Sequence, residues 1–243
     1  MTRVLLVVLG AGLFALTGCG GGDEAPSGTT AFKVYFLRDG KVWPAQREVP
    51  ATDRPWISAL EALFLGPTAQ EESDLDFETA IPDGIELDTL EIDDGIARLD
   101  VTDELTDAAL AQTVYTLTQF ASVEAVETRE GTYTRADVET FVPAILVESP
   151  LAFEEVSSPL HAIGTANTFE ATFQYELTDT DGRIVDQNFV TATSGTGTRG
   201  TFQFTTKPYT VPFDGMGSLI VFELSAKDGS RINLVEIPLE MSR

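Results

Sequence analysis

Residues 74–78 alternate acidic and apolar side chains, and this is the densest arrangement of catalytic-type groups in the chain. The acids are Asp74, Asp76 and Glu78, and the spacing can present two or three carboxylates together. Paired carboxylates perform general acid–base work in glycosidases, and clusters of them bind calcium. The segment lacks the glycine and the Asp/Asn spacing of an EF-hand loop, so the pattern predicts a solvated loop or a short strand.

The single histidine of the chain, His161, is the next candidate for chemistry. A Ser-His-Asp arrangement needs a serine beside the imidazole, and a zinc site needs further histidine or cysteine ligands. His161 instead stands between Leu160 and Ala162 in a strand-like segment. We therefore expect a half-buried strand histidine and no metal or other cofactor.

Two loop-like segments contain residues that bind ions in other proteins. Residues 179–182 begin as a calcium loop does, but they lie between two alternating segments, where Asp-Gly predicts a hairpin turn. Residues 194–200 are glycine-rich, yet they contain no Gly-Lys-Ser/Thr and open no helix. The pattern predicts a mobile loop rather than a phosphate cradle.

Four aromatic side chains could stack on sugars if they were exposed: Trp43, Trp56, Tyr133 and Tyr209. Trp56 lies on an apolar helical stripe, which predicts a core position. Trp43 and Tyr209 stand next to prolines in loop-like sequence and are the better candidates for a binding site.

Cys19 is the only cysteine, and it follows the only long apolar run near the N-terminus. Arg3, an uncharged run over residues 4–16 and small residues have the order of a secretory signal. The tetrad LTGC at residues 16–19 resembles the lipobox of bacterial lipoproteins. The resemblance implies cleavage before Cys19, a diacylglyceryl thioether on its sulfur, and a lipid anchor at the extracytoplasmic face of the cell membrane. The alternatives are a plain cleaved signal peptide or an uncleaved anchor, but an apolar run of about 13 residues is short for a span, which needs ~20.

The chain is strongly acidic, with a net charge of −24. Such a charge repels phosphate backbones and anionic lipid head groups, so it disfavours nucleic-acid partners and leaves the lipid on Cys19 as the membrane contact. No disulfide is possible within a chain that has a single cysteine, and the hydrophobic fraction of 43% must supply the packed cores.

The first half alternates strands and helices. A helix with Thr52 or Asp53 as its cap, Pro55 in its first turn and Gly66 at its end buries one apolar face. The whole pattern, β-α-β-β-α-β, predicts an α+β domain with two helices on one face of a small sheet. The expected strands cover residues 31–37 (continued by Val42 and Trp43 before Pro44), 85–92, 96–101 and 122–127, and the second helix covers residues 107–121.

Two motifs of this half resemble a known family. LEALFLGPT at residues 60–68 and ALAQTVYTLTQF at residues 109–120 are similar to the two signatures of the GerMN domain, and a hairpin over residues 81–101 stands between them. GerMN domains occur in sporulation and spore-germination lipoproteins. The resemblance covers about residues 32–130 and implies a fold, because no residue in the motifs is an obvious catalyst.

The second half consists of short strands separated by turns, which predicts a β-sandwich. The clearest strand alternates from Phe169 to Leu177, and Pro238 indicates a protected edge strand near the end. The other expected strands cover residues 145–147, 159–164, 184–193, 201–205, 219–225 and 231–239.

VESP at residues 147–150, SPL at 158–160 and IGTANTFE at 163–170 resemble the opening of the immunoglobulin-like domain of bacterial spore germination. This similarity extends over about residues 145–240. GerMN domains are often followed by this sandwich, so each resemblance supports the other.

We thus expect a signal peptide (1–18), a flexible tether (19–30), a GerMN-like domain (31–142) and an immunoglobulin-like sandwich (143–243). The function expected is non-catalytic binding or scaffolding of an envelope protein or cell-wall partner, related to sporulation or spore germination. One alternative is a wall-active hydrolase that uses Asp74, Asp76 or Glu78. Another is a glycan-binding or calcium-binding envelope module.

Overall fold

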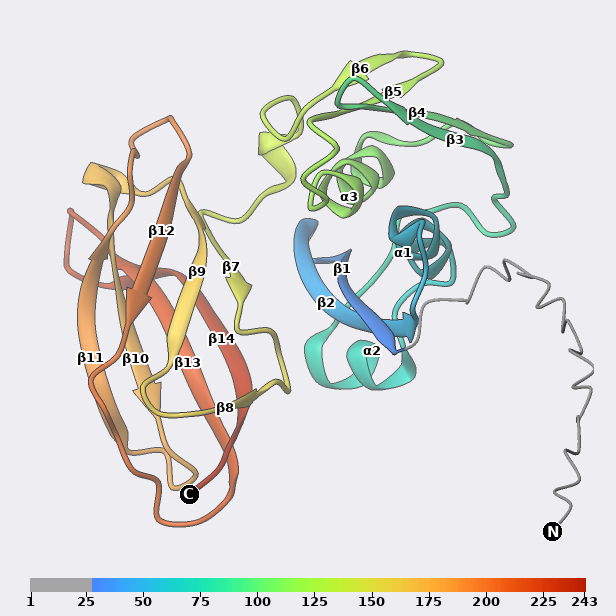
Figure 1. Cartoon of the computed structure of the whole chain (residues 1–243). Coiled ribbons are helices and arrows are strands. Elements are labelled where there is room, and N and C mark those ends of the chain that lie inside the picture. The colour runs from blue at the N-terminus through green and yellow to red at the C-terminus, as the bar shows by residue number, and fades with distance from the viewer. Residues whose placement is uncertain (1–27) are drawn as a thin grey trace, which may run out of the picture.

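The computed structural model describes residues 28–243 (Figure 1). The predicted signal peptide, residues 1–18, and Cys19 lie outside the described residues. Within residues 28–243, no helix is long and apolar enough to cross a membrane.

The N-terminal unit is an α+β fold, as predicted, but its strands form two sheets. One sheet is the hairpin β1-β2, and the other has the order β3-β4-β5-β6, with β4 and β5 parallel. Helices α1 and α3 lie between the two sheets (Figure 1). The elements are β1 (Thr29–Arg38), β2 (Lys41–Pro50), α1 (Pro55–Phe64), α2 (Ala69–Leu75), β3 (Leu87–Asp93), β4 (Ile96–Val101), α3 (Asp107–Leu117), β5 (Ala125–Thr128) and β6 (Gly131–Tyr133).

The hairpin β1-β2 is longer than the sequence suggested. The prediction that the second strand stops before Pro44 is wrong, because β2 continues to Pro50. Pro44 lies opposite Tyr35, whose backbone N–H and C=O bond to α3 instead of to β2. The missing N–H of a proline therefore leaves no ladder hydrogen bond unmade at this position.

The open edge of β1 is covered by side chains of α3 and of the turn after it. Lys33 N–H donates to Gln119 Oε1 at 2.7 Å, and Tyr35 N–H donates to Thr116 Oγ1 at 3.1 Å. Gln112 Nε2 donates to the carbonyl oxygen of Tyr35 at 3.0 Å. Gln112 and Thr116 are fully buried, and their hydrogen bonds explain how an apolar core tolerates them.

Helix α1 begins without a side-chain cap, so the predicted cap at Thr52 or Asp53 is wrong. The residue before the helix is Arg54, and Thr52 Oγ1 accepts a hydrogen bond from the Arg54 N–H rather than from the helix. Pro55 opens the helix as predicted, since its fixed φ suits a first turn. Gly66 follows the helix with a φ of +81°.

The C-terminal unit is the predicted sandwich. Its sheets have the orders β11-β10-β13-β14-β8 and β12-β9-β7. Phe173, Tyr175 and Leu177 of β10 are buried between the sheets, as their alternation predicts. The elements are η1 (Glu139–Phe141) before the sandwich, β7 (Ile145–Ser149), β8 (Glu155–Val156), β9 (His161–Ala166), η2 (Phe169–Ala171), β10 (Thr172–Thr178), β11 (Ile184–Thr191), β12 (Gly200–Thr205), β13 (Gly215–Leu224) and β14 (Arg231–Met241).

The expected start of β10 at Phe169 is wrong. Residues Phe169–Ala171 form a 3-10 turn in which Glu170 and Ala171 have φ values of 52° and 57°. The turn breaks the alternation, so Phe169 is 56% exposed instead of sharing the buried face of the strand.

Candidate functional site

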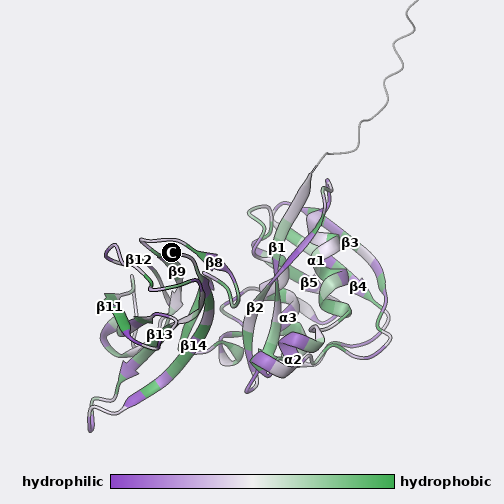
Figure 2. Ribbon diagram, turned by 90° about the horizontal axis from the view of Figure 1, so that it is seen from below, coloured by the Kyte–Doolittle hydropathy of each residue, from purple (hydrophilic) through white to green (hydrophobic). Residues whose placement is uncertain are grey.

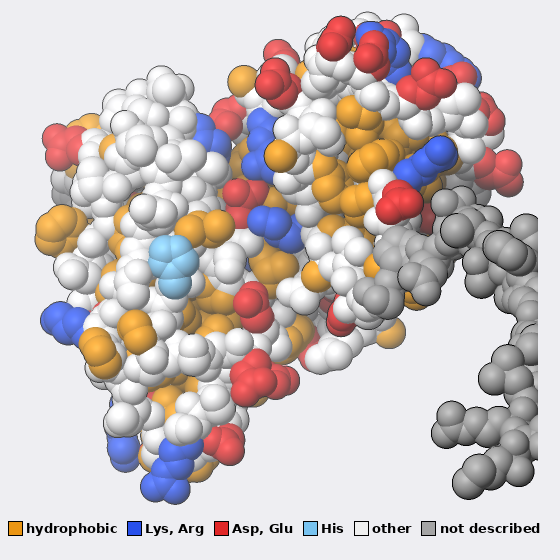
Figure 3. Space-filling model, viewed as in Figure 1, with side chains coloured by type: hydrophobic (Ala, Val, Ile, Leu, Met, Phe, Trp, Pro, Cys, Tyr) orange, Lys and Arg blue, Asp and Glu red, His pale blue; other side chains and the backbone are white. Residues whose placement is uncertain are grey.

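A cluster of charged and aromatic side chains joins the two units. Glu148 of β7 accepts hydrogen bonds from the Tyr35 hydroxyl at 2.5 Å and from Arg135 Nη1 at 3.0 Å. Lys33 Nζ donates to the carbonyl oxygen of Glu148 at 3.2 Å, and the Arg135 guanidinium lies 4.4 Å from the ring centre of Tyr115. Figure 3 shows acidic and basic side chains gathered where the two lobes meet. We call these five residues the Glu148 cluster.

The electrostatics of the Glu148 cluster favour a fixed arrangement of charges. Burial alone would raise the pKa of Glu148, but the charges of Arg135 and Lys33 and the hydrogen bonds from Tyr35 and Arg135 lower it below its ordinary value. Burial raises the pKa of the Tyr35 hydroxyl, and the negative charge of Glu148 raises it further. Glu148 is therefore an anion and Tyr35 a neutral donor at neutral pH, which suits a joint rather than proton transfer.

The segment between the units, residues 134–144, is bonded to both. Arg135 Nε donates to Thr118 Oγ1, just beyond α3, at 2.8 Å. From the sandwich, Arg199 Nε donates to Glu139 Oε2 at 2.8 Å and Arg199 Nη2 donates to the carbonyl oxygen of Pro143 at 2.7 Å. Arg199 belongs to the glycine-rich segment 194–200, which is thus tied to the connector.

An apolar contact lies next to the Glu148 cluster, where β2 faces β14 (Figure 2). The cavity that remains at this contact has a volume of only about 30 Å3. Trp43, a candidate for sugar stacking only if it were exposed, is 8% exposed and is covered by the Arg38 guanidinium at 4.3 Å, so it is not an accessible stacking surface. The reason is that β2 continues past this residue and carries it into the core. The lining residues are Arg38, Trp43, Pro44, Leu75, Phe77, Val147, Pro150, Leu151, Ala152, Glu236 and Ile237.

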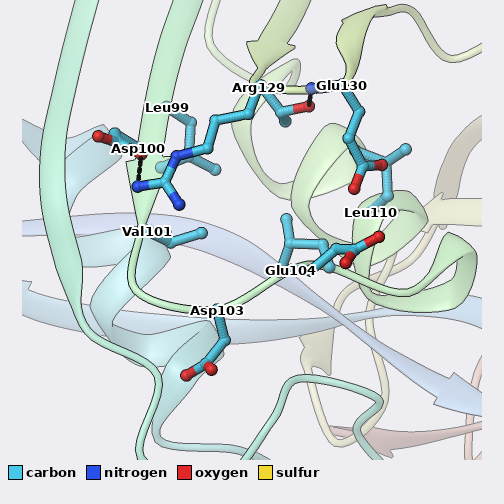
Figure 4. A pocket seen from close by; sticks show the side chains of 10 residues that line it. Leu99, Asp100, Val101, Asp103, Glu104, Leu110, Arg129 and Glu130 are labelled. Atoms are coloured by element: carbon cyan, nitrogen blue, oxygen red, sulfur yellow. Dashed lines mark hydrogen bonds and ion pairs between the residues drawn. The ribbon is translucent and has the colours of Figure 1, made fainter.

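A cleft of about 200 Å3 opens between β4, the start of α3 and the β5–β6 turn (Figure 4). Arg129 points toward Asp100, with 2.5 Å between Nη2 and Oδ1. Glu104 and Glu130 approach each other beside Leu110 on the other side. The floor of the cleft is Leu99, Val101, Leu105 and Leu110, and its polar residues are Asp100, Asp103, Glu104, Thr128, Arg129 and Glu130.

The rim of this cleft is acidic and open to water. A hydrogen bond with Glu104 raises the pKa of Glu130, and the proximity of the two carboxyl groups adds to the rise. Such a rim attracts cationic groups. Within residues 28–243, no three His, Cys, Asp or Glu side chains are placed to hold one metal ion.

The acids predicted as a possible catalytic set divide between two places. Asp74 lies in the last turn of α2, whereas Asp76 ends that helix with a φ of 54°. Glu78 exchanges two backbone hydrogen bonds of 2.8 Å with Leu37. Asp76 and Glu78 line one open hollow together with Glu72, and Asp74 is not part of it. The prediction of a loop or short strand is wrong for the part of the segment that belongs to α2.

Helix α2 was missed because its residues are mostly polar, although its start carries a recognisable signal. Thr68 Oγ1 accepts from the Glu71 N–H, and Glu71 Oε2 accepts from the Thr68 N–H, which is a capping box. Arg47 of β2 adds a two-pronged ion pair to Glu71 at 2.6 and 2.7 Å.

The other candidate residues have structural partners. Asp179 Oδ1 accepts hydrogen bonds from the Asp181 and Arg183 N–H groups, so the predicted hairpin turn is confirmed. The Tyr209 hydroxyl donates to the carbonyl oxygen of Ser157 at 3.3 Å, and the ring is half-buried. His161 lies in a strand as predicted, but it is exposed rather than half-buried because it stands on the outer face of its sheet.

Two family models match the chain. Residues 33–129 match the model described as sporulation and spore germination, and residues 144–230 match the immunoglobulin-like domain of bacterial spore germination. The comparison with curated proteins found no match.

Several solved structures are similar to parts of the chain. The first GerMN domain of the sporulation protein GerM from Bacillus subtilis is 22% identical over 41% of this chain and 81% of that one, with a TM-score of 0.33. The tandem GerMN domains of the same protein are 16% identical over 74% of this chain and 62% of that one, with a TM-score of 0.39. CopC from Methylosinus trichosporium OB3b is 13% identical over 40% of this chain and 91% of that one, with a TM-score of 0.28.

Proposed function

Because this chain carries a sporulation and spore germination domain followed by an immunoglobulin-like domain of bacterial spore germination, we propose that it is a non-catalytic scaffold of the bacterial envelope. In this role a lipid on Cys19 holds the protein at the extracytoplasmic face of the membrane. The folded units then bind an envelope protein or cell-wall component and keep it at a set place.

The observation that carries the scaffolding role is the Glu148 cluster. A scaffold must hold its partner at a fixed position relative to its anchor, and this requires a stiff connection between its units. Glu148 is bonded to the N-terminal unit through Tyr35 and to the connector through Arg135. Arg199 bonds the far end of the connector back to the sandwich. A partly buried ion pair whose members also bond to other groups restricts the relative motion that is otherwise expected between domains.

The anchoring part of the proposal rests on the LTGC motif at residues 16–19. Two acyl chains on one sulfur anchor a protein stably, at ~0.8 kcal/mol per buried methylene. Its test is the Cys19→Ser variant, followed by metabolic labelling with a radioactive fatty acid and by fractionation of the cells. We expect the label to disappear and the protein to leave the membrane fraction, whereas the neighbouring Ser27→Ala control keeps both. Unchanged labelling and retention of Cys19→Ser would refute lipid anchoring.

The binding part is tested by crosslinking the full chain in its native envelope and identifying what is captured. We expect a recurring envelope partner whose capture falls when Glu148→Gln loosens the joint, with the exposed Glu91→Gln as a matched control. The non-catalytic part has its own test. Turnover of peptidoglycan by the purified chain that is lost in Asp76→Asn or Glu78→Gln would contradict the proposal and favour a hydrolase.

A further inference from the structure

The outer face of the large sandwich sheet combines aromatic and amide side chains. The register places Phe189 of β11 beside Gln174 of β10, and Gln174 beside Phe222 of β13. Two residues further along β10, on the same face, Glu176 lies beside Gln187 of β11. β11 is the strand farthest from the N-terminal unit (Figure 1), so this side of the sheet is not covered by that unit.

These residues form a shallow hollow of about 300 Å3. Phe189 is 67% exposed and forms an apolar wall. The residues around the hollow are Gln174, Tyr175, Glu176, Gln187, Asn188 and Phe189. We call it the amide hollow.

Glu176 at the side of the amide hollow is held in one orientation. Arg231 donates two hydrogen bonds to its carboxylate, at 2.6 and 2.9 Å. The Arg231 guanidinium lies 4.1 Å from the ring centre of Phe222, which supports it from below. A carboxylate fixed in this way keeps its free lone pairs pointed at one place, as a preorganised binding group does.

We propose that the amide hollow binds an uncharged glycan. Sugar hydroxyl groups both donate and accept hydrogen bonds, and the side-chain amides of Gln174 and Gln187, which share the outer face with Phe189, offer both functions at neighbouring positions. The C–H face of a sugar ring packs on an aromatic ring, which the exposed Phe189 provides.

Charge and composition decide between this ligand and others. The net charge of −24 repels polyanions, so a neutral polysaccharide is favoured over a phosphate-bearing polymer. A protein partner is less suited, because the centres of protein interfaces are depleted of charged residues and here the Glu176–Arg231 ion pair borders the hollow. A neutral glycan would be a cell-wall partner of the kind that the proposed envelope role requires, so the biological meaning of the site rests on that role. The binding itself does not require the lipid on Cys19.

The experiment titrates the isotope-labelled full chain with tetra-N-acetylchitotetraose, a neutral linear oligosaccharide, and follows the backbone and side-chain amide signals by NMR. We expect saturable shifts of the side-chain amide signals of Gln174 and Gln187. Phe189→Ala should weaken the binding about tenfold. The control is Phe213→Ala, which removes a phenylalanine that is 50% exposed in the loop before β13.

The absence of shifts at millimolar sugar, or equal binding by Phe189→Ala and the unchanged chain, would overturn the glycan site. Loss of a crosslinked protein in Phe189→Ala without any sugar response would overturn it in favour of a protein interface. These outcomes are distinct from a failure of the proposed function, since that failure is read from the membrane retention and envelope capture of the protein.

Discussion

The side-chain amide of Gln119 pairs with the backbone of Lys33 as a neighbouring strand would. Its Oε1 accepts from the Lys33 N–H at 2.7 Å, and its Nε2 donates to the Lys33 carbonyl oxygen. Thr116 and Gln112, about one and two turns earlier in the chain, do the same for the N–H and the carbonyl oxygen of Tyr35. An open strand edge invites pairing with other chains, and here a helix and its following turn occupy that edge with side chains.

The first prediction concerns Gln112, which is fully buried. Its Oε1 accepts from the Ala80 N–H at 2.7 Å, and its Nε2 donates to the carbonyl oxygen of Tyr35 at 3.0 Å. Gln112→Leu leaves the buried carbonyl oxygen of Tyr35 and the part-buried N–H of Ala80 without a partner, so the free energy of unfolding should fall by about 3 kcal/mol. Urea unfolding followed by circular dichroism measures this change.

Gln70→Leu is the matched control, because Gln70 is exposed on α2. Its effect on the free energy of unfolding should stay within about 0.5 kcal/mol. Equal effects of the two substitutions would show that the edge of β1 does not need the amide of Gln112.

The second prediction concerns Gly164, at the centre of β9. A methyl group at this position would stand 2.1 Å from the carbonyl oxygen of Leu146 and 2.7 Å from the ring of Phe202. Gly164→Ala must push β7 and β12 away from β9, and we expect a loss of about 3 kcal/mol of stability.

Gly182 provides the control for Gly164. It sits in a turn with a φ of +74° and has nothing within 4 Å of an added methyl group. Gly182→Ala should cost about 1 kcal/mol through backbone strain alone. A thermal unfolding series that ranks the two variants in the opposite order would refute the crowding at Gly164.

Local patterns in the sequence were enough for much of the fold. The apolar stripe of α1 and the strict alternation of β10 depend only on near neighbours in the chain, and both were predicted. Helix α2 was missed because its signal is a capping box in polar sequence and not an apolar period. Trp43 was expected at the end of a strand, because Pro44 suggested that a loop begins there, whereas the pairing of Pro44 with Tyr35 lets the strand continue.

The candidate site was harder to predict, since its contacts join residues far apart in the chain. Lys33 and Glu148 are separated by 115 positions, and the local sequence around either residue does not indicate that the other is its partner. Gln112 and Thr116 are polar residues on a helix that is almost wholly buried, and such residues need hydrogen-bond partners inside the fold. The identity of the partner, the edge of β1, follows only from the fold.

The third prediction separates the two roles of Glu71. This carboxylate completes the capping box with Thr68 and forms the ion pair with Arg47. Burial would raise the pKa of Glu71, but the hydrogen bonds from Arg47 and Thr68 lower it overall, so the group is ionised at neutral pH. Glu71→Gln keeps the hydrogen bond to the Thr68 N–H and loses the charge, whereas Glu71→Ala loses both.

We expect Glu71→Gln to lower the free energy of unfolding by about 1 kcal/mol and Glu71→Ala by about 2 kcal/mol. Chemical denaturation of both variants measures the difference. If Glu71→Gln were as unstable as Glu71→Ala, the capping bond would contribute nothing and only the ion pair would matter.

The fourth prediction is a pH dependence that comes from Glu148. Its pKa in the folded protein lies below the ordinary value of 4.5, because Arg135, Lys33 and Tyr35 outweigh the effect of burial. A carboxyl group with a lowered pKa stabilises the fold fully above its unfolded value, and that contribution is lost as the pH falls through the folded value. The unchanged chain should therefore lose stability in acid, starting at about pH 5.

Glu148→Gln removes this contribution and leaves the Arg135 guanidinium half-buried without its counter-ion. At pH 7 the variant should be less stable by about 2 kcal/mol, and its stability should fall less steeply than that of the unchanged chain below about pH 5. The exposed Glu91→Gln serves as the control and should keep the original slope. Urea unfolding at a series of pH values from neutral to acid measures both curves. Parallel curves for Glu148→Gln and the unchanged chain would mean that the charge at the joint between the two units does not hold them together.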